Sequence, residues 1–170
     1  MINNDINYFF WASKDRENAA KERVKKDDVW MNFVIRNAEH HSKCKRAKYL
    51  SIIIDDKNRL VGMGWNGKPA GSICDDVCFR EGLESNSAKD IICCVHSEIN
   101  CLLNTNRQDR FRGTMYVNGI PCQNCMVVIL NSNLKRLVYL DNEEGHRGDG
   151  DLFWKRYGLD MEIIKYEKDT

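Results

Sequence analysis

The chain has 170 residues, of which 42% are hydrophobic and 30% are charged, and this size and composition predict one compact domain with a sizeable core. With 26 Lys and Arg residues against 25 Asp and Glu residues, the net charge of +1 provides no general field for attracting a long nucleic acid. No apolar run approaches the roughly 20 residues that cross a bilayer, and the start of the chain lacks the features of a signal peptide. We therefore expect a cytoplasmic protein.

The first elements in chain order are a charged extension, a helix and a hairpin. Residues 1–27 are expected to form an N-terminal extension, and residues 28–170 the domain. A helix is predicted from Asp28 to about Ser42, capped by Asp27 or Asp28, because apolar residues recur there at helical spacing. Two short apolar segments separated by a polar turn then predict a β-hairpin over residues 49–54 and 60–65.

The second half alternates helices and strands. Residues 66–91 form a glycine-containing segment that is longer than a simple loop between two elements, so we expect it to have a functional role. Helical and strand patterns then alternate over residues 97–104, 114–118, 122–130, 136–140, 149–157 and 159–166. Because strand–helix–strand units make parallel pairs, this order predicts a mixed five-stranded sheet with helices on its faces.

The chain has eight cysteines, at positions 44, 74, 78, 93, 94, 101, 122 and 125. Without a secretion signal, thiolates that bind a metal are a better interpretation than disulfides. The two-residue gap between Cys122 and Cys125 lets both sulfurs face one ion. Taken alone, such a pair is about as often two buried core cysteines, and a redox disulfide is a further alternative.

A histidine and a glutamate sharpen this interpretation. His96 and Glu98 begin one predicted helix, and Cys122 and Cys125 begin the next. A helix N-terminus favours negative charge and hence the thiolate. One imidazole and two thiolates leave the fourth position of a tetrahedral zinc open, where a bound water becomes acidic enough to ionise near neutral pH. Glu98 is predicted to carry the water proton to a substrate nitrogen.

This H-x-E and P-C-x-x-C pattern is the signature of zinc deaminases. The chain resembles the cytidine deaminase superfamily and, within it, the deoxycytidylate (dCMP) deaminases of cells and bacteriophages. Residues 42–46, 64–71 and 74–76 also resemble segments of that family, and the similarity spans about residues 28–166. The combined pattern argues against the core-cysteine and redox alternatives.

The resemblance implies a fold, a reaction and a set of roles. The fold is a three-layer α/β/α sandwich with a five-stranded mixed sheet. The reaction is hydrolysis of dCMP to dUMP and ammonia, which supplies dUMP for thymidylate synthesis, with water attacking C4 of cytosine. His96, Cys122 and Cys125 hold the catalytic Zn²⁺ and Glu98 shuttles protons. Asn66 bonds the deoxyribose, and Ser97, where the family commonly has alanine, offers its backbone N–H to the pyrimidine.

The resemblance also implies a homo-oligomer, often a hexamer, that dCTP activates and dTTP inhibits with Mg²⁺, in the host cytoplasm if the protein is viral. Lys43, Lys45 and Arg46 could contact a substrate or effector phosphate, or form a solvated basic face. Cys44, Cys74, Cys78 and Cys94 are candidates for a second, structural zinc, by resemblance to some phage enzymes and because thiolates are soft ligands that suit zinc. The alternative is that these cysteines are core residues and free loop thiols.

Two segments depart from the family pattern. Residues 118–120 lack the usual Ser or Thr of the base pocket, and residues 48–51 replace the common Val-Gly-Ala entry to the first strand. Two rival functions stay open: a polynucleotide deaminase acting on tRNA adenosine or DNA cytosine, and a noncatalytic zinc-binding or redox module. Neutral charge and the Gly-Trp-Asn-Gly segment favour a mononucleotide substrate, and Glu98 beside an open metal favours catalysis.

Overall fold

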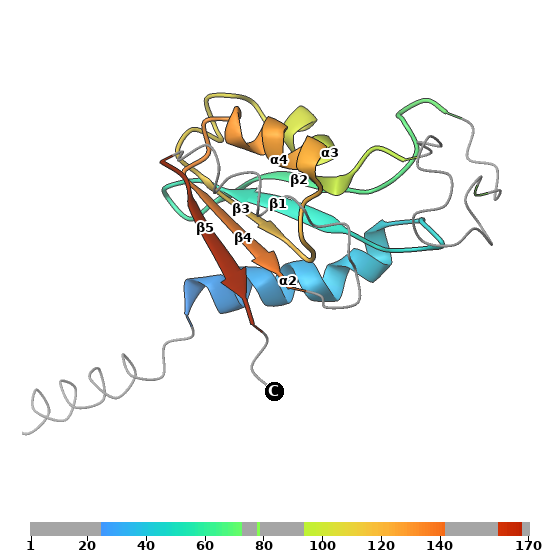
Figure 1. Cartoon of the computed structure of the whole chain (residues 1–170), viewed down its shortest axis with the longest axis horizontal. Coiled ribbons are helices and arrows are strands. Elements are labelled where there is room, and N and C mark those ends of the chain that lie inside the picture. Colours follow the sequence, from blue (N-terminus) through green and yellow to red (C-terminus); the bar gives the residue numbers. More distant parts are fainter. Residues whose placement is uncertain (1–24, 73–77, 79–93, 142–159, 168–170) are drawn as a thin grey trace, which may run out of the picture.

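The computed structural model describes residues 25–72, 78, 94–141 and 160–167. A five-stranded mixed sheet lies between one helix on one face and two helices on the other (Figure 1), which confirms the expected α/β/α architecture. The elements are α2 (Lys26–His41), β1 (Leu50–Ile54), β2 (Leu60–Trp65), α3 (Ser97–Leu103), β3 (Thr114–Val117), α4 (Gln123–Leu130), β4 (Arg136–Leu140) and β5 (Glu162–Tyr166). Among these helices, none is long and apolar enough to cross a membrane.

The direction of the strands determines where the site lies. The strand order is β2-β1-β3-β4-β5, with β1 antiparallel to both of its neighbours and β3, β4 and β5 parallel. Since β2 and β3 are both antiparallel to β1, they run in the same direction. Helices α3 and α4 each follow one of these strands and lead back to a parallel one, so both helices begin at the same edge of the sheet.

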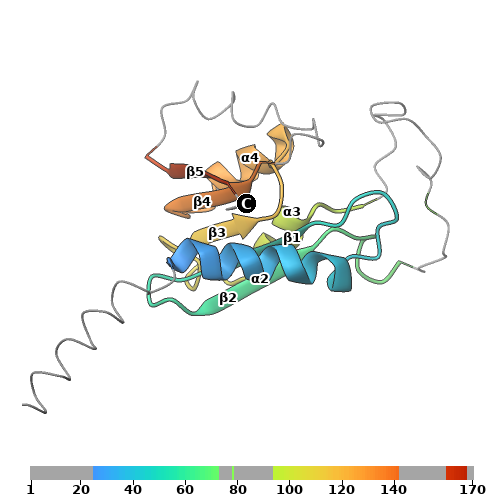
Figure 2. The ribbon, with the colours of Figure 1, turned by 90° about the horizontal axis from the view of Figure 1, so that it is seen from below.

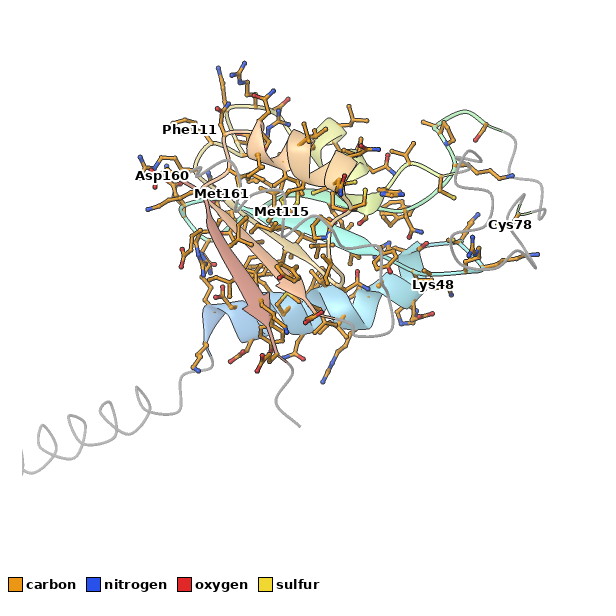
Figure 3. The ribbon with its side chains drawn as sticks, in the orientation of Figure 1. Lys48, Cys78, Phe111, Met115, Asp160 and Met161 are labelled. Carbon is orange, nitrogen blue, oxygen red and sulfur yellow. The ribbon has the colours of Figure 1, made fainter. Side chains whose placement is uncertain are left out.

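Alternation along the strands divides the core into two layers. In β1, all five residues are buried: Leu50, Ile52 and Ile54 face α2, while Ile53 faces α3 and α4. Helix α2 lies across β1, β3 and β4 (Figure 2). On the other face, Met115 of β3 is fully buried among the side chains that α3 and α4 contribute (Figure 3).

Among the described residues, the predicted elements agree with the observed ones to within three residues at each end. Strands β2 and β4 have the predicted bounds, whereas α2 begins at Lys26 and β5 begins at Glu162. Helix α4 begins at Gln123, one residue later than predicted, with Cys122 as its N-cap. The predicted helix over residues 149–157 lies outside the described residues, as do most of residues 66–91.

Neither Asp27 nor Asp28 caps α2, contrary to the prediction, because the N-cap position is Lys25 and the Asp27 carboxylate bonds to the sheet. Tyr116 Oη donates to Asp27 Oδ1 at 2.6 Å, and Arg136 Nη2 donates to Asp27 Oδ2 at 2.9 Å. Arg136 also donates to Glu162, so the start of α2 is tied to β3, β4 and β5. Partial burial opposes ionisation of Asp27, but the bonds from Arg136 and Tyr116 outweigh it and hold its pKa below the ordinary value of 3.8.

We expect Asp27→Asn to lower the free energy of unfolding by about 1 kcal/mol near neutral pH, because Arg136 and Tyr116 lose an ionised acceptor. Since the pKa of Asp27 is depressed in the folded state, its contribution is complete above about pH 4 and is lost as the pH falls through the folded-state value. Urea unfolding between about pH 3 and pH 7 measures this. Asp56→Asn, at an exposed turn residue, is the control, and a pH-independent difference for Asp27→Asn would contradict the assignment.

Candidate active site

Three side chains with metal-binding atoms converge where α3 and α4 begin. His96 is the N-cap of α3 and Cys122 the N-cap of α4, with Cys125 in the first turn of α4. His96 Nδ1 lies 3.3 Å from Cys125 Sγ and 3.4 Å from Cys122 Sγ, and the three ligand atoms all lie within 4.8 Å of one another. In the part of the chain that the structure describes, no other three His, Cys, Asp or Glu side chains form such a group.

The topology and the cysteine spacing produce this convergence. His96 and Cys122 come from different helices whose N-termini share one edge of the sheet, as described above. Cys125 lies three residues after Cys122, a spacing that places two side chains on the same side of a helix. The imidazole therefore meets both sulfurs at once.

The electrostatics of the group prepare it for a cation. A hydrogen bond with the Cys125 thiol lowers the pKa of Cys122 to about 4, burial opposes this, and a further bond with His96 assists it. The pKa of Cys125 is raised, because it keeps the proton that the two sulfurs share and because it is buried. One imidazole with two thiolates is a donor set typical of zinc, and the third donor becomes available when a metal displaces the shared proton. The three residues therefore fit Zn²⁺.

Glu98 lies beside this group and is 6% exposed. Burial raises its pKa, while its own backbone N–H, the charge of His96 and the Ser97 hydroxyl lower it. A hydrogen bond between Glu98 and Cys125 contributes to the raised pKa of that thiol, which places the carboxylate against the metal-binding group. A buried carboxylate in this position can take and return a proton near neutral pH.

Ser97 occupies the first position of α3 and is fully buried. Its hydroxyl Oγ donates to Glu98 Oε2 at 2.9 Å. The same Oγ lies 2.8 Å from Ser51 Oγ on β1. Sequence reasoning assigned only the backbone N–H of Ser97 and missed this side-chain contact.

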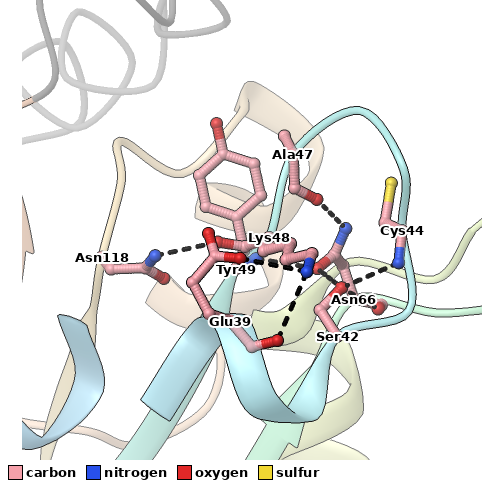
Figure 4. A network of polar contacts seen from close by, with 8 residues as sticks. All are labelled: Glu39, Ser42, Cys44, Ala47, Lys48, Tyr49, Asn66 and Asn118. Carbon is pink, nitrogen blue, oxygen red and sulfur yellow. Dashed lines mark hydrogen bonds and ion pairs between the residues drawn. The ribbon is translucent and has the colours of Figure 1, made fainter. Parts of the chain in front are cut away.

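Asn66 holds the segment that precedes β1 (Figure 4). Its Oδ1 accepts from Ser42 Oγ at 2.7 Å and from the backbone N–H of Tyr49 at 2.8 Å, and its Nδ2 donates to the carbonyl oxygen of Ala47 at 2.9 Å. The residue is 6% exposed. One amide hydrogen is left for the predicted contact with a deoxyribose.

Asn118 holds the same segment from the other side of β1. Its Nδ2 donates to the carbonyl oxygen of Lys48 at 2.9 Å, and its Oδ1 accepts from the backbone N–H of Leu50 at 2.7 Å. The ring of Tyr49 lies over Gly119, where a Cβ atom would approach ring carbon Cε1 to 2.4 Å. The entry to β1 is thus fixed against the loop that leads to Cys122. The sequence signal for this arrangement is an Asn-Gly pair directly after each of β2 and β3.

The remaining predicted residues are the basic residues after Ser42 and the cysteines proposed for a second zinc. Lys43 and Lys45 are exposed, and Arg46 is half-buried with an Nη1 atom that has no hydrogen-bond partner among the described residues. Of the candidates for a second zinc, Cys44, Cys78 and Cys94 are half-buried, and Cys74 lies outside the described residues.

Comparisons with known proteins identify similar chains. The sequence model of the cytidine and deoxycytidylate deaminase zinc-binding region matches residues 24–141. The deoxycytidylate deaminase of Mycobacterium phage D29 is 35% identical over 109 residues, covering 60% of this chain and 84% of its own. The human deoxycytidylate deaminase is 27% identical over 124 residues, covering 70% of each chain.

A solved structure is similar in fold. The dCMP deaminase of cyanophage S-TIM5 in complex with dCMP and dUMP aligns with a TM-score of 0.64 and 21% identity. The alignment covers 85% of this chain and 100% of the cyanophage chain.

We expect Cys122→Ala to lose about one equivalent of bound zinc, because a three-donor site that loses one thiolate holds the metal far more weakly. Atomic absorption of the purified protein measures the metal content. Cys101→Ala is the matched control, since Cys101 is a core cysteine with a pKa raised to about 12 by burial and lies outside the group. Equal zinc loss in both variants would contradict the assignment.

We expect Asn66→Ala to lower the melting temperature and to weaken nucleotide binding while zinc is retained. Three hydrogen bonds that hold the segment before β1 are lost, which destabilises the fold by about 1–3 kcal/mol. Calorimetric titration with dCMP and a zinc assay test this separation. Asn106→Ala, at an exposed asparagine bonded to Asp109, is the control. A loss of zinc equal to that of Cys122→Ala would contradict the assignment of Asn66 to nucleotide binding.

Proposed function

The chain belongs to the cytidine and deoxycytidylate deaminase family with a zinc-binding region, and on that premise we propose that it catalyses the hydrolysis of dCMP to dUMP and ammonia. Its relatives in a phage and in humans are deoxycytidylate deaminases, and a fold neighbour binds dCMP and dUMP. The single observation that carries the proposal is the buried carboxylate of Glu98 against the group formed by His96, Cys122 and Cys125. A structural zinc site would need no such carboxylate.

The chemistry divides between the metal and the chain. His96, Cys122 and Cys125 would hold Zn²⁺, and the bound metal would supply the Lewis acidity that makes a water molecule acidic near neutral pH. The Glu98 carboxylate takes one proton from the water that attacks C4 of cytosine and delivers it to the pyrimidine nitrogen, and then moves a second proton from the new C4 hydroxyl to the departing amino group. Water and dCMP are consumed, and dUMP and ammonia leave. Burial of Glu98 excludes bulk water from this transfer.

We assign the substrate contacts to the edge where β1 and β2 meet the site. The amide hydrogen of Asn66 that Ala47 does not use would donate to the deoxyribose, and the backbone N–H of Ser97 to the pyrimidine. Lys43, Lys45 and Arg46 follow Ser42, which Asn66 binds, so their charges lie in the segment next to the sugar contact. These cations would receive a phosphate of the substrate or of an effector.

Assembly and regulation form a further part of the proposal. Leu103 on α3 and Val127 and Val128 on α4 are 75%, 46% and 43% exposed, and burying these apolar side chains against a second copy favours a homo-oligomer. A hexamer, with dCTP and Mg²⁺–dTTP as effectors, rests on the family resemblance alone. So does a second zinc on Cys44, Cys74, Cys78 and Cys94. The need for reduced thiolates at the site supports a cytoplasmic setting.

The decisive experiment compares substrates. Zinc-loaded protein is incubated with dCMP, dCTP, cytidine and single-stranded DNA, and ammonia release is followed. We expect turnover of dCMP, and a loss of at least about a hundredfold in Glu98→Gln, because the amide cannot carry the proton. Zinc content should stay at the parent level in that variant. Glu39→Gln, at an exposed carboxylate of α2, should keep parent activity.

Each other outcome has a distinct meaning. Deamination restricted to DNA would replace the proposal with a polynucleotide deaminase. Zinc binding without turnover of any substrate would leave a noncatalytic zinc-binding module. Full activity in Glu98→Gln would remove Glu98 from the reaction.

A further inference from the structure

Two buried serines form a hydroxyl chain that ends at the catalytic carboxylate. Ser51 is a polar residue in the apolar strand β1, and Ser97 opens α3; both are fully buried. Their Oγ atoms lie 2.8 Å apart, and Ser97 Oγ donates to Glu98 Oε2 at 2.9 Å. Neither hydroxyl takes part in the chemistry described above. Burying a hydroxyl group costs desolvation free energy unless a hydrogen bond offsets it.

The direction of the hydrogens follows from their number. A serine hydroxyl has one hydrogen, and when the Glu98 carboxylate is ionised, as it must be to accept a proton from water, Ser97 donates its hydrogen to Oε2. The hydrogen between the two Oγ atoms must therefore come from Ser51. The chain runs from Ser51 to Ser97 to Glu98, and each member is oriented by the one before it.

The fold enforces this contact through the packing of α3 on β2. A Cβ atom on Gly64 would lie 2.1 Å from the backbone nitrogen of Cys101, so α3 lies directly against the strand backbone at this glycine. Ser51 is paired with Gly64 in the sheet. The close approach of α3 to Gly64 brings the start of the helix down onto β1, within hydrogen-bonding distance of Ser51.

We propose that Ser51 and Ser97 are positioning residues for Glu98. The hydroxyl chain holds Oε2 in place and leaves Oε1 as the oxygen that exchanges protons during deamination. This inference rests on the proposed function, because it names which carboxylate oxygen acts there. A carboxylate held in one orientation reacts more often from the productive geometry than one that rotates, so the pair acts on kcat.

The test is a double-mutant cycle on Ser51→Ala and Ser97→Ala, in which alanine keeps the Cβ atom and removes only the hydroxyl. With dCMP as substrate, we expect Ser97→Ala to lower kcat about tenfold and to change KM less than about twofold. Ser51→Ala should lower kcat about threefold. The double variant should match Ser97→Ala, since Ser51 acts through Ser97 alone.

Stability gives a second, independent pattern. Ser97→Ala leaves the Ser51 hydroxyl buried without its partner, and the double variant removes that hydroxyl. We therefore expect metal-free Ser97→Ala to unfold at a lower temperature than the parent, and the metal-free double variant to recover part of that loss while its zinc-loaded form keeps the low kcat. A purely structural role predicts that kcat recovers together with stability, and that result would overturn the proposal.

A matched control separates the hydroxyl chain from any buried serine. Ser132 is 4% exposed and donates to the carbonyl oxygen of Ile129, away from the site. Ser132→Ala should lower stability and leave kcat at the parent level. If Ser97→Ala keeps the kcat of the parent, the positioning role is overturned and the proposed function stands. If the parent protein releases no ammonia from dCMP, the proposed function is overturned, and this inference with it.

Discussion

The common direction of β2 and β3, on either side of the antiparallel β1, is the constraint on which the site depends. It places the first residues of α3 and α4 at one edge of the sheet, where an imidazole on one helix meets two sulfurs on the other. The same edge receives the entry to β1, so a strand residue can reach the start of α3. Reversing either β2 or β3 would carry His96 and Cys122 to opposite ends of the sheet.

Side-chain amides extend the sheet at this edge beyond the ends of its strands. Asn66 contacts residues 47 and 49, and Asn118 contacts residues 48 and 50, so alternate backbone groups are bound from the two sides. Each amide supplies a donor and an acceptor in the way that a neighbouring strand would. Without them, backbone groups at the rim of the site would need water as a partner. The amides therefore give a loop the rigidity of a strand beside the metal-binding group.

Local patterns in the sequence predicted much of this molecule, and long-range contacts account for the rest. Helix and strand periodicity and the motif residues are local, so the element order and the identity of the three side chains that cluster, His96, Cys122 and Cys125, followed from the sequence. Asp27 or Asp28 was expected to cap a helix, but neither does, and Arg136 of the sheet, more than 100 residues away, binds the Asp27 carboxylate. The contact between Ser51 and Ser97 likewise joins residues 46 apart, although a serine within an apolar strand was a visible anomaly. The periodicity of the sequence does not predict which distant residue such a polar group contacts.

The site brings together buried polar groups. The desolvation free energy of each group is offset only by its hydrogen bonds and charge interactions with the others. Cys122 readily forms a thiolate because Cys125 keeps the proton that the two sulfurs share. The buried carboxylate of Glu98 is stabilised by hydrogen bonds from the Ser97 hydroxyl and from its own backbone N–H. Removing any one partner leaves another with an unmet charge or hydrogen bond in a region of low dielectric. Such mutual dependence explains why the polar residues follow one another so closely at the starts of α3 and α4. A helix that supplied only one of them would bury a charge that nothing nearby could balance.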